Sequence, residues 1–212
     1  MAGWPAIARS LSPSHRSIGQ YWGFAKMTPT IFVFDLEATC GDEIRSDDME
    51  ILEIGGVMQT FEGVELGRFH SLVKPLMHPT LTAFCKDLLP HIDQESINAA
   101  ASWSTVGASL ASWLQQYQQP GSYTASWGAW DRKAIAREAS RHGVSDPMAG
   151  MQHQNLKHAW AKQRRCKQVG FVKALEIAGL TLDGLRHHAL YDAINTAKLL
   201  PFCPRPDPVA GG

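Results

Sequence analysis

Three β-prone segments precede the first clear helix of this sequence. Residues 31–34 form a short apolar run, and residues 49–60 and 63–73 have the composition of two further strands. Gly63 marks a turn between the second and third segments, which predicts a hairpin. This order predicts a sheet whose first strands run antiparallel.

The rest of the chain alternates helical patterns with a further strand. A strand is predicted over residues 121–127. Helices are predicted over residues 91–101, 105–117, 131–142, 169–178 and 187–200. Strands that are followed by helices mixed with a strand indicate an α/β fold, in which helices flank a mixed central β-sheet.

The length of 212 residues fits one domain, which we assign to residues 27–203. Residues 204–212 are rich in Pro and Gly and are expected to form a flexible tail. Residues 1–26 contain no Asp or Glu. They fit either a disordered or non-native extension, with Met27 as the effective start, or an organelle transit peptide. We favour the first interpretation.

The charges of the chain balance. Lys plus Arg number 20 and Asp plus Glu number 20, so the formal net charge is zero. Hydrophobic residues make up 44%, which is enough for a globular core. A uniformly basic nucleic-acid binder is therefore excluded. A local basic groove beside a local acidic metal site is compatible with a net charge of zero.

Four cysteines are scattered at positions 40, 85, 166 and 203, and they form no C-x-x-C pair. This spacing is typical of neither a zinc site nor a disulfide framework, and it favours a reducing, cytoplasmic compartment. No apolar stretch reaches the roughly 18 residues that cross a bilayer, so we expect no membrane partner.

Two carboxylates lie where the first predicted strand ends. Asp35 and Glu37 form a D-x-E pair, and alternation in an extended strand puts both side chains on one face. They repel each other unless a cation lies between them, and their oxygen ligands suit Mg²⁺ or Mn²⁺. Taken alone, the pair also fits a solvated strand end.

Three further residues extend this set. Asp131 follows the predicted strand 121–127, although an Asp there can also cap a helix. Asp192 lies five residues after His187, so both can face one pocket if His187 directly precedes the last helix. Four carboxylates can hold two divalent ions roughly 4 Å apart. A histidine with a near-neutral pKa can take the proton of an attacking water.

These residues resemble the three motifs of the DEDDh exonuclease family. The motifs are similar to residues 34–40 (FDLEATC), residues 130–131 (WD) and residues 187–193 (HHALYDA), and the resemblance covers residues 30–200. It implies a ribonuclease H-like fold and 3′–5′ exonuclease activity. It also implies two metal ions on Asp35, Glu37, Asp131 and Asp192, with His187 rather than His188 as the general base.

Within this family, the D-x-E-A-T-C form is most similar to the exoribonucleases that trim histone messenger, ribosomal and small interfering RNA ends. Leu36 departs from this branch, which often has Phe there, but both side chains are apolar. Bacterial relatives of the branch include an inhibitor of a sporulation kinase pathway. A regulatory, protein-binding role is therefore one alternative, and single-stranded DNA as the substrate is another.

Further residues are candidates for holding the 3′ end of a nucleic acid. By the resemblance, the backbone at Ala38 and Thr39 contacts the terminal ribose. Phe84 and Trp130 either stack on the terminal base or belong to the core. A basic run lines a phosphate-binding groove or forms a solvated face. It comprises Lys157, Lys162, Arg164, Arg165, Lys167 and Lys173.

The sequence thus predicts a metal-dependent exoribonuclease that acts on single-stranded RNA 3′ ends and releases nucleoside 5′-monophosphates. Loss of one acidic residue would favour the regulatory alternative, but all five positions of the predicted catalytic set are present.

Overall fold

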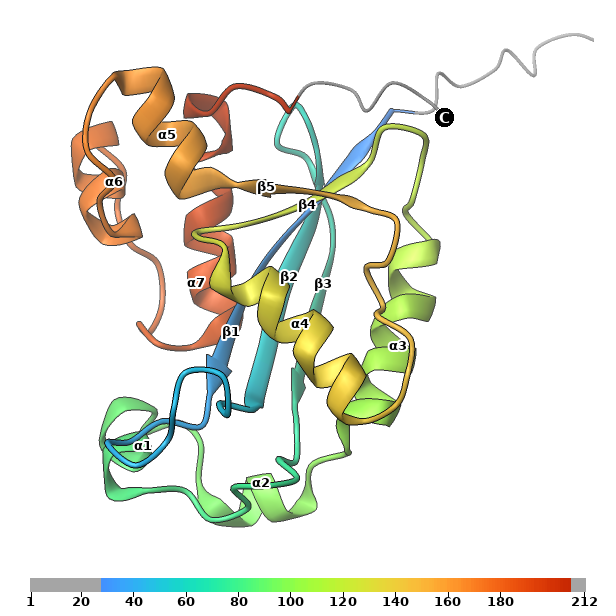
Figure 1. Ribbon diagram of the computed structural model, residues 1–212. Coiled ribbons are helices and arrows are strands. Elements are labelled where there is room, and N and C mark those ends of the chain that lie inside the picture. The colour runs from blue at the N-terminus through green and yellow to red at the C-terminus, as the bar shows by residue number, and fades with distance from the viewer. Residues whose placement is uncertain (1–27, 207–212) are drawn as a thin grey trace, which may run out of the picture.

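A five-stranded mixed sheet forms the centre of the protein (Figure 1). The computed structural model describes residues 28–206. The strand order is β3-β2-β1-β4-β5, in which β1, β2 and β3 pair antiparallel and β1, β4 and β5 pair parallel. The strands are β1 (Thr30–Ala38), β2 (Ile51–Thr60), β3 (Glu65–Leu72), β4 (Tyr123–Ser126) and β5 (Gln152–Asn155). The predicted α/β fold with a mixed sheet is confirmed.

Helices cover both faces of this sheet. One face packs against α3 (Trp103–Gln115) and α4 (Trp130–Arg141), and β1 contributes Phe32, Phe34 and Leu36 to that core. The opposite face packs against α7 (Ala189–Ala197). The remaining helices are α1 (Ala83–Leu88), α2 (Gln94–Ala99), α5 (Leu156–Arg164), α6 (Phe171–Ala178) and the short 3-10 turn η1 (Leu200–Phe202).

The face of β1 that meets α7 changes from apolar to acidic along the strand. Ile31 and Val33 belong to a buried cluster with residues of α7 and η1. Because strand side chains alternate, Asp35 and Glu37 continue this same face. The local alternation of β1 therefore carries both acids out of the core and toward the start of α7.

Gly55 lets the start of α7 approach the sheet closely. It lies opposite Asp35 in the pairing of β1 with β2. A Cβ atom at this position would lie 2.1 Å from the backbone nitrogen of Leu190 and 2.4 Å from the carbonyl carbon of Ala189. Any larger residue would therefore push α7 away from the acidic face of β1.

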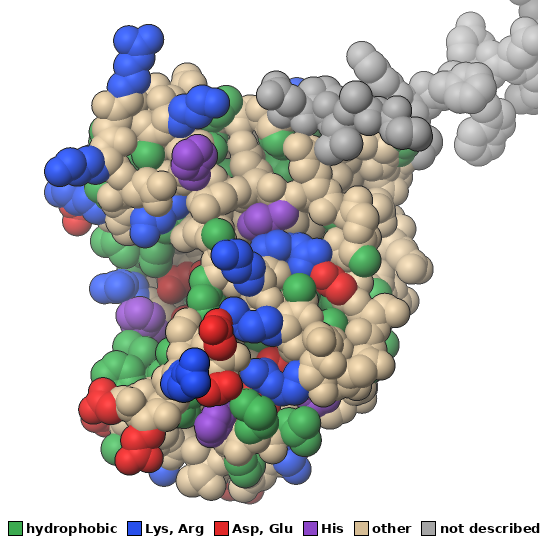
Figure 2. All heavy atoms as spheres, in the orientation of Figure 1, with side chains coloured by type: hydrophobic (Ala, Val, Ile, Leu, Met, Phe, Trp, Pro, Cys, Tyr) green, Lys and Arg blue, Asp and Glu red, His purple; other side chains and the backbone are tan. Residues whose placement is uncertain are grey.

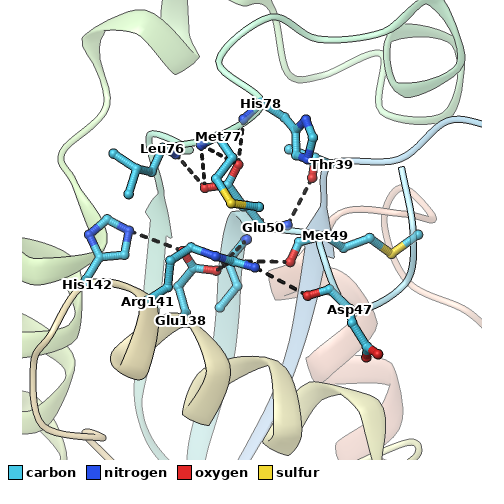
Figure 3. Close-up of polar contacts among 11 residues, drawn as sticks. Thr39, Asp47, Met49, Glu50, Leu76, Met77, His78, Glu138, Arg141 and His142 are labelled. Atoms are coloured by element: carbon cyan, nitrogen blue, oxygen red, sulfur yellow. Dashed lines mark hydrogen bonds and ion pairs between the residues drawn. The ribbon is translucent and has the colours of Figure 1, made fainter. Parts of the chain in front are cut away.

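A buried polar network fastens α4 and the loop at residues 76–78 to the start of β2 (Figure 3). The Glu50 carboxylate accepts backbone N–H bonds from all three loop residues, at 2.5–3.0 Å. Glu138 of α4 accepts a hydrogen bond from Arg141 at 2.8 Å and one from the N–H of Ile51 at 3.4 Å. Because α4 also carries Asp131, this network holds that acid in place relative to the sheet.

Several predicted element ends are corrected. The first strand continues to Ala38, three residues past its predicted end at Asp35, because β2 remains paired with it to that point. The last helix begins at Ala189 instead of residue 187, since His187 has a φ of +57° that no α-helix allows. The helix predicted over residues 91–101 is shorter, because Asp93 caps its start by accepting the N–H of Ser96.

Besides the short 3-10 turn η1, three elements were not predicted. β5 has the polar sequence QHQN, which carries no strand signal of its own, and its parallel pairing with β4 defines it. α1 has six residues, too few for a periodic pattern. α5 carries part of the basic run, for which a solvated face was one of two interpretations, and no helix was predicted over its residues.

The predictions for residues 1–26, and for most of the tail, fall outside the described residues. Among residues 28–206, none of the helices has both the length and the apolar character that a membrane crossing requires.

Candidate active site

The D-x-E pair and Asp131 meet at one edge of the sheet. β1 and β4 are parallel neighbours, so their carboxyl ends lie side by side. Asp35 and Glu37 occupy the last part of β1, and Asp131 lies in the first turn of α4, five residues beyond the end of β4 at Ser126. Parallel pairing between distant segments therefore brings three acids together.

The start of α7 brings the fourth acid and the histidine. The N–H of His187 donates to Oδ2 of Asp192 at 3.1 Å, and this bond supports the left-handed backbone of His187, which few residues other than glycine adopt. One ligand atom each of Glu37, His187 and Asp192 lies within 4.8 Å of the others. The structure thus places all five residues of the predicted set around one site.

Burial raises the pKa of all four acids, and the charges of neighbouring carboxylates add to this for Asp35, Glu37 and Asp192. Burial, followed by the charges of Asp131, Glu37 and Asp192, raises the pKa of Asp35 well above its usual value. Burial and its acidic neighbours likewise raise the pKa of Glu37 to about 8. Burial raises the pKa of Asp131 and that of Asp192 to about 6 each.

This arrangement fits divalent cations. Oδ1 of Asp192 is buried without a hydrogen-bond partner. Within residues 28–206, no Lys or Arg forms an ion pair with any of the four carboxylates. Four clustered oxygen donors without a neutralising side chain are the ligand chemistry of Mg²⁺ or Mn²⁺.

His187 is suited to accept a proton. Burial, with a smaller effect from the nearby Arg186 charge, lowers the pKa of its imidazole, so the ring is neutral at physiological pH. Nη2 of Arg186 lies 3.4 Å from Nε2 of His187. A neutral ring at the edge of four acids can take a proton from water in the site.

Phe84 is presented to solvent next to the end of β1. It is 57% exposed, so the core alternative for this residue is wrong. Its helix α1 is anchored to β1, because Thr82 Oγ1 donates to the carbonyl of Cys40 at 2.6 Å and the Cys40 and Cys85 sulfurs lie 2.8 Å apart. The scattered spacing of the cysteines gave no sign of this contact.

The other predicted substrate-binding residues differ in burial and in how many hydrogen bonds they already make within the protein. Trp130 is partly buried against the main core, with the Arg137 guanidinium 5.6 Å from its ring centroid. The N–H of Thr39 donates to the backbone carbonyl of Glu50. The Thr39 hydroxyl accepts the backbone N–H of Glu50 (Figure 3). These bonds occupy Thr39, so the neighbouring Ala38, which is partly exposed, is the better placed of the two for a ligand.

The basic run lies on α5, the loop after it and α6. Figure 2 shows Lys and Arg side chains gathered at the upper left, where Figure 1 places these helices. The guanidinium of Arg164 lies 4.0 Å from the Trp160 ring centroid, whereas most of the run is exposed. Below these helices the face is hollowed, and acidic side chains are visible inside the hollow (Figure 2).

Glu53 was not among the predicted site residues. Glu53 lies on β2 opposite Glu37, is fully buried, and accepts the N–H of Ala189 at 3.0 Å. Burial alone would raise its pKa, but hydrogen bonds led by His70 lower it, so the carboxylate stays ionised. An acidic residue inside the otherwise apolar start of β2 was the signal that could have identified it.

Comparisons with known proteins match this chain to one family and its relatives. The family described as Exonuclease matches residues 32–200. ERI1 exoribonuclease 2 of Danio rerio is 28% identical over 188 residues, which are 80% of this chain and 34% of that protein. The 3′-5′ exonuclease Snipper of Drosophila melanogaster is 25% identical over 193 residues, which are 80% of this chain and 67% of that protein. The chain therefore spans about a third of the length of the Danio rerio relative.

Solved structures share the fold. The nuclease domain of 3′hExo, a DEDDh family member bound to rAMP, has a TM-score of 0.76 and 20% identity, covering 87% of this chain and 99% of that one. A 3′-exonuclease from a structure of 3′-end specific recognition of histone mRNA stem-loop has a TM-score of 0.74 and 20% identity, covering 81% and 80%. The match over residues 32–200 shows that the chain belongs to the exonuclease family, and the ribonuclease H-like fold that it shares with these structures agrees with this.

Proposed function

We propose that this chain is a metal-dependent 3′–5′ exoribonuclease that releases nucleoside 5′-monophosphates. The observation that carries the proposal is the convergence of four acids and one histidine at one edge of the sheet, with raised carboxyl pKa values and no cationic side chain paired to them within residues 28–206. The names of the relatives, which include exoribonucleases, support RNA as the substrate.

Asp35, Glu37, Asp131 and Asp192 would hold two Mg²⁺ or Mn²⁺ ions. When bound, such ions lower the pKa of an attacking water and offset the charge that develops on the leaving 3′ oxygen. A ring nitrogen of the neutral His187 accepts the proton of this water. The bond from the His187 N–H to Asp192 holds the backbone of His187 beside the acids, so the protein contributes position and electrostatics.

The 3′ end of the substrate would lie between the acids and α1. Phe84 offers an exposed ring for stacking on the terminal base, and stacking tolerates any base. The backbone at Ala38 lies beside the acids and allows a close approach to the terminal ribose, where a contact with the 2′-OH would favour RNA. The basic side chains of α5 and α6 would bind phosphates farther along the strand.

The test is digestion of matched, 5′-labelled single-stranded RNA and DNA with Mg²⁺, Mn²⁺ or EDTA, in parallel with Asp35→Asn. We expect a ladder that shortens from the 3′ end, forms faster on RNA, and is absent with EDTA or in the variant. A faster ladder on DNA would replace the proposed substrate with single-stranded DNA. Absence of cleavage of either polymer with metal present would overturn the enzyme assignment and favour a regulatory binding module.

A further inference from the structure

Beside the acidic site lies a cluster of histidines around one buried carboxylate. His70 of β3, His91 from the segment before α2, and His188 at the start of α7 all approach Glu53 of β2. Within residues 28–206, two groups of His, Cys, Asp or Glu residues have ligand atoms that all lie within 4.8 Å of one another. One is Glu37, His187 and Asp192 of the acidic site, and the other is Glu53, His70 and His188.

The two oxygens of Glu53 have different surroundings. Oε2 accepts the N–H of Ala189 at 3.0 Å and lies 3.0 Å from Nε2 of His91. Oε1 lies 2.5 Å from Nε2 of His70 and 3.3 Å from Nδ1 of His188. That Nδ1 atom is buried and has no hydrogen-bond partner. Oε2 is thus held by Ala189 and His91, while Oε1 is hydrogen-bonded to His70 and also faces the unpartnered Nδ1 of His188.

We propose that Glu53, His70 and His188 form a transition-metal site for Zn²⁺, separate from the acidic site. One carboxylate and two imidazoles are the protein ligands of a common class of zinc sites, in which water takes the fourth position. Nitrogen ligands favour Zn²⁺ over Mg²⁺, whereas the four carboxylates next to this cluster have the opposite preference.

The surroundings supply the orientation that such a site needs. The bonds from Ala189 and His91 fix Oε2, and ligating carboxylates are commonly held in this way. The His91 ring stacks on His188 with centroids 4.6 Å apart, which limits the rotation of His188. The His70 side chain is 38% exposed, which leaves a path for the ion from solvent.

Two of the three distances between the proposed ligand atoms are close to those of a bound state, and the third is at most 4.8 Å. Zinc bonds to nitrogen and oxygen of about 2.0–2.1 Å separate tetrahedral ligand atoms by roughly 3.3 Å. The distance from Oε1 to His188 already has this value, and the shorter one to His70 has to lengthen by less than about 1 Å. Such a shift is available to His70, whose side chain lies at the solvent side of β3.

Zinc bound here would stiffen the start of α7. Glu53 already holds the N–H of Ala189, and His188 directly precedes that residue. An ion that joins Glu53, His70 and His188 links β2, β3 and the start of α7. The free energy of unfolding should therefore rise with Zn²⁺ concentration.

Calorimetric titration of the full chain with Zn²⁺ tests the site, with Asp35→Asn, His70→Ala, His91→Ala and His158→Ala as the variants. His158 is an exposed histidine of α5 and serves as the matched control. We expect a Zn²⁺-binding event that survives Asp35→Asn and His158→Ala, weakens about 10–100-fold in His91→Ala, and is lost in His70→Ala. Co²⁺ added to the same proteins should give the visible absorption of a nitrogen- and oxygen-ligated ion, and that absorption should be lost in His70→Ala only.

Two results would overturn the proposal. One is Zn²⁺ binding that is lost in Asp35→Asn and retained in His70→Ala, because this would locate the ion in the acidic site. The other is the same binding isotherm for the wild type and His70→Ala. His70 is exposed on β3, so its variant should fold, and a thermal melt of each variant checks this. None of these readouts depends on nuclease activity.

Discussion

Glu37 and Glu53 lie opposite each other on β1 and β2, and both are buried, yet the pKa values of their carboxyl groups are shifted in opposite directions. The pKa of Glu37 is raised to about 8, because burial and three neighbouring acids disfavour its charge. The pKa of Glu53 is lowered, because hydrogen bonds from His70, Ala189 and His91 outweigh its burial. The two residues belong to two adjoining regions: the acidic site of four carboxylates and the histidine cluster around Glu53.

The difference between these regions shows that burial alone does not determine the state of a carboxylate. In the acidic site no Lys or Arg of residues 28–206 forms an ion pair with the four carboxylates, so bound protons or the proposed metal ions relieve the repulsion. In the histidine cluster the protein itself supplies donors to a single charge. The same replacement of an acid by its amide should therefore act in opposite directions in the two regions.

The largest effect is expected for catalysis in Asp35→Asn. This variant removes a proposed metal ligand without changing the volume of the side chain, so we expect no measurable cleavage of labelled RNA and a native circular dichroism spectrum. Asp47→Asn is the matched control, since the Asp47 side chain is 79% exposed and its ion pair is with Arg137, not with any residue of the acidic site. Equal activity in the two variants would remove Asp35 from the site.

Separate replacement of the adjacent residues His187 and His188 tests which of them belongs to the acidic site and which to the histidine cluster. His187→Ala should lower the cleavage rate by about 10²–10⁴-fold, because the proton acceptor is lost. His188→Ala should have a smaller effect on the rate, since His188 faces Glu53. Single-turnover rates with saturating Mg²⁺ measure both. A larger loss in His188→Ala would transfer the proposed role to that residue.

Glu53→Gln should destabilise the protein. The amide keeps an acceptor for the N–H of Ala189, but it brings an NH₂ group toward histidine donors and removes the charge that they stabilise. We expect a loss of about 2 kcal/mol in the free energy of unfolding. Urea denaturation with EDTA present measures this loss. A gain in stability would show that the charge of Glu53 destabilises the fold, as the charges of the acidic site do.

Asp192→Asn should act in the opposite direction on the metal-free protein, and only at higher pH. The pKa of Asp192 is raised from 3.8 to about 6 by burial, so the folded state holds a proton that the unfolded state releases. That contribution to stability is complete below about pH 3.8 and is lost as the pH rises through 6. The stability of the wild type should therefore fall by about 2 kcal/mol relative to Asp192→Asn over this range.

Urea denaturation of both proteins in EDTA, at intervals from pH 4 to pH 7.5, measures this difference. Addition of Mg²⁺ at pH 7.5 should restore the stability of the wild type and leave that of the variant nearly unchanged. Parallel pH profiles for the two proteins would show that Asp192 does not carry the excess proton.

The sequence by itself determined the features that depend on neighbouring residues. Alternation along residues 31–37 places Asp35 and Glu37 on one face, and this needs no other part of the chain. Gly63 and the β-prone segments around it predicted the β2–β3 hairpin, because a turn and two strands form from contiguous residues. The order of the three motifs predicted the family, which the comparisons confirm.

Only the tertiary structure decided which distant residues meet. β5 has no strand signal and exists because β4 offers a parallel edge. The partners of Glu53 come from β3, from the segment before α2 and from the start of α7, and no spacing in the sequence encodes their approach. The physical reason is that charge repulsion, hydrogen bonding and burial act through space. The state of Glu37 and of Glu53 is therefore a property of the packed sheet and α7, and neither residue type nor local pattern specifies it.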